Sequence, residues 1–161
     1  MKIRLLFMDV DGTLTDGKIY MGETGEVCKV FDIKDGCGIH DILPKHSIVP
    51  VIITARESSI VRNRCKELNI CEVHQGCRNK KEKMLEIAAQ YGIVLSPDNI
   101  LEQTAYIGDD ILDLQCMEVA QYKGCPSDAV DEVKSVVDFV ASKAGGNGAV
   151  RDFIEWLCKD G

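Results

Sequence analysis

Short runs of apolar residues recur along the chain, and each of them ends in polar residues. Three runs are nearly continuous, at 3–8, 47–53 and 104–107, and two weaker runs lie at 70–74 and 136–140. A short, continuous apolar run is typical of a parallel strand that is buried on both faces. The pattern therefore predicts a parallel sheet built from five strands.

Stretches with helical spacing separate these runs, at 58–68, 80–91, 110–119 and 129–135. Strands that alternate with helices favour an α/β fold, a three-layer sandwich in which a central, Rossmann-like parallel sheet is covered on both faces. Ligands of such sheets bind beyond the carboxyl ends of the strands. Acidic and hydroxyl residues of this chain collect at those ends, so we expect the functional site there.

Two segments break the alternation. Residues 18–31 carry apolar side chains on both sides of Gly22-Glu23-Thr24-Gly25, which predicts a β-hairpin that projects from the site. Residues 144–161 begin with a glycine-rich stretch and end in a short amphipathic helix at 152–159; a flexible linker is the alternative for the glycines. Because no linker between domains is found, we expect residues 1–161 to form a single domain.

The composition is that of an ordinary globular domain, with 45% hydrophobic and 28% charged residues. The formal net charge of −7 gives no basic surface for nucleic acid or for an anionic membrane. The first residues do not form a signal peptide, and no stretch approaches the roughly 18 apolar residues of a membrane span. We therefore expect a cytoplasmic protein that binds neither nucleic acid nor a membrane.

The positions of the cysteines argue against a zinc site. The chain has eight cysteines and no C-x-x-C pair, so a structural zinc ion is not expected. In a cytoplasmic protein the thiols are expected to be reduced and mostly buried.

The strongest chemical signal is the segment Asp9-Val10-Asp11-Gly12-Thr13-Leu14-Thr15, directly after the first strand. The Asp9 carboxylate can attack phosphorus if a cation screens its repulsion from the phosphate, which gives an aspartyl-phosphate. Asp11 can protonate the leaving alcohol and later deprotonate the attacking water. A pair of solvated turn aspartates is the alternative. The order of the two carboxylates, the preceding strand and the following glycine resemble the nucleophile motif of the haloacid dehalogenase superfamily of phosphotransferases.

Further residues follow the later strands in the order that this superfamily has them. The resemblance implies that the Thr54 hydroxyl binds a phosphate oxygen and that Lys80 neutralises the phosphate and the nucleophile. Taken singly, Thr54 is more often a helix cap, and Lys80 is more often a solvated lysine.

An acidic group after the third strand, Asp109, Asp110 and Asp113, completes the set. Carboxylate oxygens are ligands that suit Mg²⁺. The resemblance implies that Asp9, the backbone carbonyl of Asp11 and Asp109 bind Mg²⁺. Asp110 and Asp113 then orient these ligands, although negative charge at a helix N-terminus also explains both.

The segment from Gly12 to Lys18 also fits the first seven positions of a P-loop, G-x-x-x-x-G-K. A P-loop needs a hydroxyl residue next and then a helix, whereas this chain continues with Ile19 and the expected hairpin. We therefore treat this match as accidental.

The sequence leaves no room for the large cap domain that many members of the superfamily carry. The interval up to Thr54 holds the hairpin and one short helix, and the interval from Lys80 to Asp109 holds a helix and a loop. A capless phosphatase leaves its site open, so we expect another subunit to shield it.

Several parts of the chain look like the 3-deoxy-D-manno-octulosonate 8-phosphate phosphatases: the segments 31–39, 54–56, 75–80 and 144–151, and Arg64 followed by Leu68. The resemblance implies a Mg²⁺-dependent phosphomonoesterase that acts on a 3-deoxy-2-keto sugar acid phosphate in lipopolysaccharide biosynthesis. It also implies a homotetramer in which hairpins associate and the glycine-rich tail reaches a neighbouring site. A close relative of the family, which acts on nine-carbon, sialic-acid-type 9-phosphates, is the alternative.

The candidate substrate contacts are Lys34, Asp35, Arg56, Arg64 and Arg151. Arg56 favours the eight-carbon substrate, because the nine-carbon branch tends to place an acid at that position. Lys34 stands where the family commonly has arginine, and lysine lacks the planar fork that pairs with a carboxylate. For each cation taken singly, a solvated surface residue is an equally good explanation.

Two functions from other classes use similar features. A receiver-type phospho-signalling module places its phosphorylated aspartate at the end of a middle strand, where this chain has Thr54. A non-catalytic oligomerisation domain does not need a nucleophile, an acid/base and metal ligands together. The sequence therefore favours the phosphatase.

Overall fold

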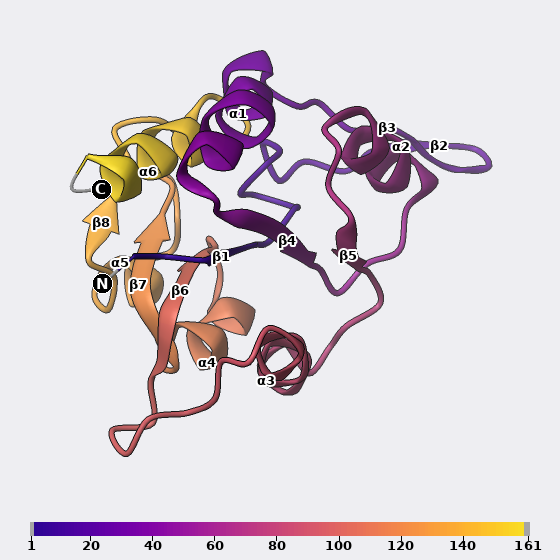
Figure 1. Ribbon diagram of the computed structural model, residues 1–161. Helices are drawn as coiled ribbons and strands as arrows, with labels where there is room; N and C mark the ends of the chain where they lie inside the picture. Colours follow the sequence, from indigo (N-terminus) through magenta and orange to yellow (C-terminus); the bar gives the residue numbers. More distant parts are fainter. Residues whose placement is uncertain (1, 160–161) are drawn as a thin grey trace.

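The computed structural model describes residues 2–159 and has a parallel sheet at its centre (Figure 1). Within these residues the sheet has six strands in the order β5-β4-β1-β6-β7-β8, and every neighbouring pair is parallel. The strands are β1 (Leu5–Met8), β4 (Val49–Ile53), β5 (Glu72–His74), β6 (Leu101–Ile107), β7 (Ala120–Cys125) and β8 (Phe139–Val140). Residues 1, 160 and 161 of the expected domain and tail lie outside the described residues.

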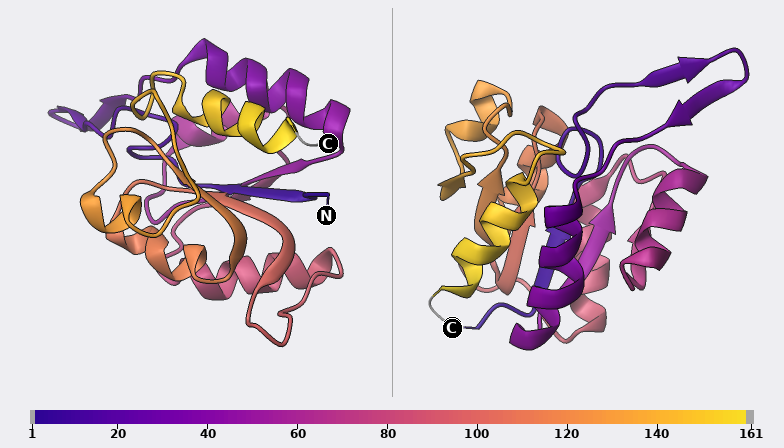
Figure 2. Two further views of the ribbon diagram at one scale, coloured as in Figure 1. Left: turned by 90° about the vertical axis from the view of Figure 1, so that its left-hand side faces the viewer. Right: turned by 90° about the horizontal axis from the view of Figure 1, so that it is seen from above.

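Helices cover both faces of the sheet, as the left view of Figure 2 shows. One face carries α1 (Ile33–Cys37), the π-helical turn η1 (Gly38–Ile42), the 3₁₀ turn η2 (Leu43–His46), α2 (Ser59–Glu67) and α6 (Ala149–Cys158). The other face carries α3 (Lys80–Gln90), the 3₁₀ turn η3 (Ile111–Asp113), α4 (Leu114–Met117) and α5 (Asp131–Lys134). The predicted three-layer α/β fold is confirmed.

Strand β1 joins two hydrophobic cores, because successive side chains of a strand point to opposite faces of the sheet. Leu6 and Met8 pack in the core under α2 and α6, whereas Leu5 and Phe7 pack in the core over α3 and α4. All four side chains are completely buried. This double burial explains why β1 is an almost uninterrupted apolar run in the sequence.

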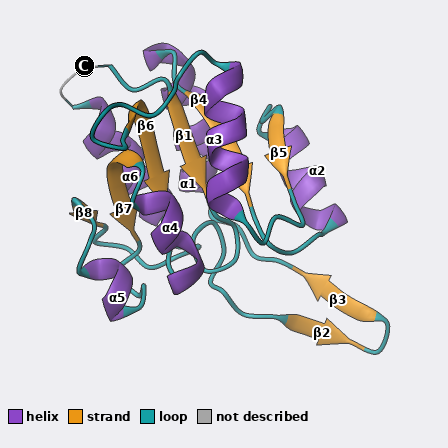
Figure 3. Cartoon of the chain, turned by 90° about the horizontal axis from the view of Figure 1, so that it is seen from below, coloured by secondary structure: helices purple, strands orange, loops and turns teal. Residues whose placement is uncertain are grey.

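The predicted hairpin at 18–31 is confirmed. Its strands β2 (Tyr20–Gly22) and β3 (Gly25–Cys28) are antiparallel and project away from the sheet (Figure 3). Gly25 has a φ of +125°, a conformation that favours glycine. The hairpin exposes apolar side chains on both strands, with Met21 64% and Val27 61% exposed.

Strand β7 is the main feature that the apolar pattern does not predict. It alternates apolar residues with Gln121 and Lys123, and its middle residues are only partly buried. Polar residues also extend β6, which begins at Leu101 although the apolar run begins at 104. The sequence between 110 and 119 forms two short turns of different type, η3 and α4, instead of one helix.

The glycine-rich segment packs on its own chain. Helix α6 begins at Ala149, three residues before the predicted start at 152, and its Phe153 is completely buried. A Cβ atom on Gly145 would collide with the carbonyl oxygen of Gly12, and the amide of Gly146 donates to the carbonyl of Thr13 at 3.2 Å. A flexible linker is therefore the wrong interpretation of these two glycines, while contact with a neighbouring subunit stays a prediction.

All eight cysteines lie in the described residues as free thiols, and three of them are buried. Three others are exposed, so the expectation of mostly buried thiols is wrong. Among the described helices, none combines the length and the apolar character that a membrane crossing requires.

Candidate active site

The carboxyl ends of β1, β4 and β6 meet at one edge of the sheet. The register aligns Met8, the last residue of β1, with the last residue of β6 and with the penultimate residue of β4. Asp9, Thr54 and Gly108 are the next residues along the three strands, and Asp109 follows Gly108. The predicted clustering of these motifs is confirmed, and it results from strand pairing between distant parts of the chain.

Three carboxylates form the centre of the site. One oxygen of each of Asp9, Asp109 and Asp113 lies within 4.8 Å of the others. Burial and the charge of Asp113 raise the pKa of Asp9 to about 7, although Lys80 opposes this shift. Burial, Asp9 and Asp113 likewise raise the pKa of Asp109 to about 7. Oxygen ligands with this mutual repulsion fit Mg²⁺, whose charge relieves the repulsion.

Asp113 holds the neighbouring groups in place. It is completely buried, and its Oδ1 accepts hydrogen bonds from Lys80 Nζ at 2.8 Å and Tyr106 Oη at 2.6 Å. Its Oδ2 accepts from the backbone amides of Asp109 at 3.0 Å and Asp110 at 3.2 Å. Because both oxygens are engaged, the geometry favours the orienting role of Asp113 over direct contact with a cation.

Lys80 lies between two buried carboxylates, those of Asp9 and Asp113. Its Nζ is 2.9 Å from Asp9 Oδ1 and 2.8 Å from Asp113 Oδ1, and the residue is only 3% exposed. Burial alone lowers the pKa of Lys80, but the charges of Asp9 and Asp113 raise it above its ordinary value. Lys80 is therefore a buried cation, and the alternative of a solvated lysine is wrong. Its neighbour Lys81 pairs with Glu118 instead.

The carboxylate of Asp11 faces the hairpin. Lys29 Nζ lies 2.5 Å from Asp11 Oδ1, and Arg56 Nη1 lies 3.7 Å from Asp11 Oδ2. Glu26 pairs with both cations, at 3.1 Å from Lys29 and 3.0 Å from Arg56. Of the two cations that contact Asp11, the motifs identify only Arg56.

Sequence reasoning also does not identify Thr13 and Tyr106. Thr13 Oγ1 donates to Asp109 Oδ1 at 3.0 Å, and Tyr106 donates to Asp113. The signal for Thr13 is its place inside the nucleophile motif. A signal for Lys29 exists as well, because it is a lone charge in the otherwise apolar segment 27–31.

Thr54 and Asp110 differ in their local roles. Thr54 is 3% exposed, and its backbone bonds to His74 and Cys77. The cap of α2 is Ser58, so a helix cap is the wrong interpretation of Thr54. Asp110 is exposed and accepts from the amide of Ile111 at 2.7 Å, as expected of charge at a helix N-terminus.

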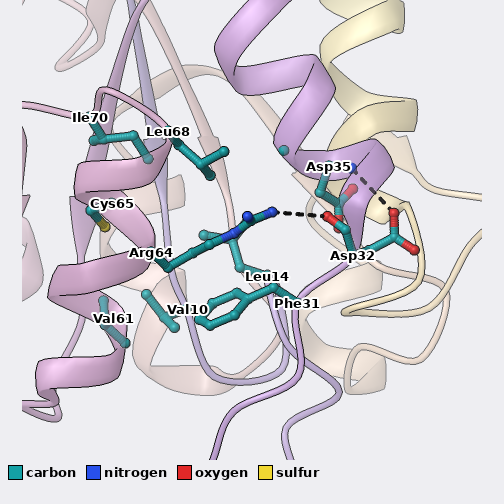
Figure 4. A pocket seen from close by; sticks show the side chains of 11 residues that line it. Val10, Leu14, Phe31, Asp32, Asp35, Val61, Arg64, Cys65, Leu68 and Ile70 are labelled. Carbon is teal, nitrogen blue, oxygen red and sulfur yellow. Dashed lines mark hydrogen bonds between the residues drawn. The ribbon is translucent and has the colours of Figure 1, made fainter.

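The predicted substrate contacts do not lie together. Arg56 is beside Asp11, with its side chain 41% exposed. Arg64 and Asp35 line a separate pocket between α1, α2 and the loop after β1 (Figure 4). Lys34 is exposed to solvent, and Arg151 pairs with Glu155 of its own helix at 2.6 Å. A surface cation thus describes Lys34 and Arg151 in this structure.

Residues that line the separate pocket connect α1 to α2 and α6. The Arg64 guanidinium lies 5.6 Å from the centre of the Phe31 ring and donates to the carbonyl of Asp32 at 3.5 Å (Figure 4). Asp35 is 1% exposed and accepts from the amide of Arg151 at 2.8 Å. Burial raises the pKa of Asp35 to about 6. Asp35 is therefore placed to hold the start of α6 rather than to contact a substrate in solvent.

The raised pKa values predict that Mg²⁺ stabilises the protein more at pH 8 than at pH 6. The pKa of Asp9 and of Asp109 is raised from 3.8 to about 7, so without metal the stability falls as the pH rises from about 4 to 7. Below pH 7 protons compete with the cation for these carboxylates. Thermal unfolding at a fixed Mg²⁺ concentration should show the larger rise in Tm at pH 8, and the Asp109→Asn variant should lose most of it. An equal rise in Tm at both pH values would contradict the assignment of Asp9 and Asp109 as Mg²⁺ ligands.

Comparison with known proteins supports the assignment from the geometry. No protein-family model matches the chain. The chain is 39% identical over 155 residues to the 3-deoxy-D-manno-octulosonate 8-phosphate phosphatase of Salmonella typhi, covering 96% of this chain and 79% of the relative. The Haemophilus influenzae protein of the same name is 35% identical and is covered to 82%, again over 96% of this chain.

Solved structures agree with these relatives. The Moraxella catarrhalis phosphatase, in complex with magnesium, phosphate and KDO, matches with a TM-score of 0.89 and 37% identity, over 98% of this chain and 87% of that one. The cobalt-bound Haemophilus influenzae enzyme matches with a TM-score of 0.88 and 35% identity, over 97% and 87% of the two chains. The resemblance seen in the sequence is thereby confirmed, and this chain belongs to the 3-deoxy-D-manno-octulosonate 8-phosphate phosphatase family of the haloacid dehalogenase superfamily.

Proposed function

We propose that this protein hydrolyses 3-deoxy-D-manno-octulosonate 8-phosphate to the free sugar acid and phosphate, with Mg²⁺ as its cofactor. The observation that carries the proposal is the position of Asp9 directly after β1, 2.9 Å from the buried Lys80 and in one cluster with the carboxylates of Asp109 and Asp113. The relatives that carry this name match nearly the whole chain. A receiver module and a nine-carbon substrate are not favoured.

The first step transfers the phosphoryl group to Asp9. An oxygen of Asp9 attacks phosphorus, the bond between phosphorus and the sugar oxygen breaks, and that oxygen takes a proton from Asp11. Lys80 favours the charged form of the Asp9 carboxylate and so opposes the effect of burial. When Mg²⁺ is bound by Asp9, Asp109 and the carbonyl of Asp11, it supplies the charge that screens the phosphate from these carboxylates.

The second step returns the enzyme to its starting state. A water molecule attacks phosphorus, Asp11 takes a proton from this water, and the bond between phosphorus and Asp9 breaks. Thr54, buried at the end of β4, is the proposed contact of a phosphate oxygen. Asp113 keeps Lys80 and the loop of Asp109 in place throughout.

Recognition of the sugar acid is proposed for Arg56. This guanidinium is partly exposed beside Asp11, and a planar fork of donors suits the carboxylate of a keto acid. Lys34, Asp35, Arg64 and Arg151 stay predicted contacts. The side chains of Arg64 and Arg151 already pair with glutamates of their own helices.

We also propose that the protein is a cytoplasmic homotetramer of single-domain subunits. The two cores share one sheet, which supports a single domain. The exposed apolar residues of the hairpin, Ile19 at 45% and Met21 at 64%, support association between hairpins. Free thiols are typical of a reducing compartment.

The assembly can be measured by analytical ultracentrifugation. We expect the mass of four chains, and we expect Met21→Lys to shift the protein toward smaller species because the charge opposes apolar contact. Lys18→Met, on the same hairpin, serves as the matched control and should leave the mass unchanged. A monomer at every concentration would refute the tetramer.

The catalytic assignment predicts that Asp9→Asn lowers turnover by roughly 10⁴-fold, because it removes the nucleophile. The exposed Asp98→Asn variant is the control and should behave as the wild type. Mg²⁺-dependent phosphate release is measured on a panel of sugar phosphates that includes the eight-carbon and nine-carbon keto acid phosphates. Faster hydrolysis of the eight-carbon ester than of the other esters supports the proposed substrate. Unimpaired hydrolysis by Asp9→Asn would refute the mechanism, and preference for another ester would refute only the substrate.

A further inference from the structure

A second buried lysine approaches the active site from the hairpin. Lys29 follows β3 directly, and its side chain is only 2% exposed. Its Nζ lies 2.5 Å from Asp11 Oδ1. Each of the two carboxylates of the nucleophile motif is therefore paired with its own buried lysine, Asp9 with Lys80 and Asp11 with Lys29.

Glu26 connects this lysine to the loop after β4. Its side chain is 12% exposed and accepts from Lys29 Nζ at 3.1 Å. It also pairs with Arg56 at 3.0 Å and lies 3.5 Å from the hydroxyl of Ser58, the cap of α2. Burial acts to raise the pKa of Glu26, but Lys29 and Arg56 outweigh it and lower the pKa below its ordinary value. Glu26 thus stays charged and holds both cations.

The arrangement leaves one oxygen of Asp11 for chemistry. Lys29 binds Oδ1, while the second oxygen faces the partly exposed Arg56 at 3.7 Å. A general acid must present its proton within hydrogen-bond reach of the leaving oxygen. Fixing one oxygen restricts the rotation of the carboxylate, and the lysine that fixes it is almost completely buried.

The contact also strengthens during the reaction. A lysine interacts more strongly with a carboxylate than with a carboxylic acid. As Asp11 gives up its proton, its negative charge grows beside Lys29. An interaction that is stronger in the transition state than in the ground state increases the rate of the chemical step.

We propose that Lys29 is a positioning residue that orients Asp11 for proton transfer to the leaving oxygen, and that Glu26 fixes Lys29 for this task. The proposal rests on the proposed function, in which Asp11 is the acid. The bond between Asp9 and phosphorus forms as the ester bond breaks, and the ester oxygen takes its electron pair and the Asp11 proton. Lys29 keeps all its protons.

A structural role for Lys29 predicts a different result. If Lys29 only fastened the hairpin, its removal would slow all substrates alike. A positioning role affects substrates according to their leaving group, because an alkoxide needs the proton of Asp11 and a nitrophenolate leaves without it. The ratio of the two rates therefore distinguishes the roles.

The test is rapid-quench measurement of alcohol release in the first turnover, with the Mg²⁺-loaded full chain. The two substrates are 3-deoxy-D-manno-octulosonate 8-phosphate and 4-nitrophenyl phosphate. For Lys29→Met we expect release of the sugar acid to fall about 10- to 100-fold, less than the roughly 10²- to 10⁴-fold that a complete loss of general acid catalysis costs, and release of nitrophenolate to fall less than about threefold. Lys29→Arg should restore most of the rate. Lys18→Met, an exposed lysine of the same hairpin, should match the wild type.

Equal losses for the two substrates in Lys29→Met would overturn the proposal. If that variant does not fold, as judged by circular dichroism, Glu26→Gln replaces it: a loss confined to the alkyl ester supports the proposal, and a uniform loss or no loss overturns it. Asp11→Asn separates this proposal from the proposed function. If Asp11→Asn slows release from both substrates by the same factor, then Asp11 is not the acid, and this conclusion does not depend on Lys29.

Discussion

The buried bridge from Asp113 through Lys80 to Asp9 organises this active site. Lys80 offsets the repulsion between two buried carboxylates, and breaking such a pair leaves an unpaired charge, which typically costs about 3–5 kcal/mol. Asp113 also binds the amide of Asp109 and the hydroxyl of Tyr106. One completely buried carboxylate therefore sets the positions of the nucleophile, its cation and a predicted metal ligand.

The hairpin takes part in the chemistry as well as in the shape of the molecule. The hairpin projects where many other members of the superfamily carry a cap domain. It places Lys29 against Asp11 and Glu26 against Arg56 at the edge of the sheet. Its apolar strands meanwhile face solvent, with Met21 64% exposed. The same element thus carries both the surface proposed for subunit association and the lysine that contacts the proposed acid/base.

Features that depend on local sequence were predictable, and features that depend on distant contacts were not. The apolar run before Asp9 predicts a strand that is buried on both faces, and the structure confirms it. The motif that follows identifies Asp9 as the proposed nucleophile, because this signal is contiguous in the sequence. Strand β7 escapes prediction because Gln121 and Lys123 interrupt its apolar pattern. Lys29 reaches Asp11 only through the fold of the hairpin. The position of Asp35 was not predictable either, because its bond to the start of α6 joins residues that lie far apart in the sequence.

The central claim is that the phosphoryl group is transferred first to Asp9 and then to water. The stereochemical course at phosphorus tests it most directly, with a substrate ester whose phosphoryl group is made chiral by oxygen isotopes. Two successive in-line displacements each invert phosphorus, so the account predicts net retention of configuration. Net inversion would mean that water attacks the substrate directly, and it would contradict the account.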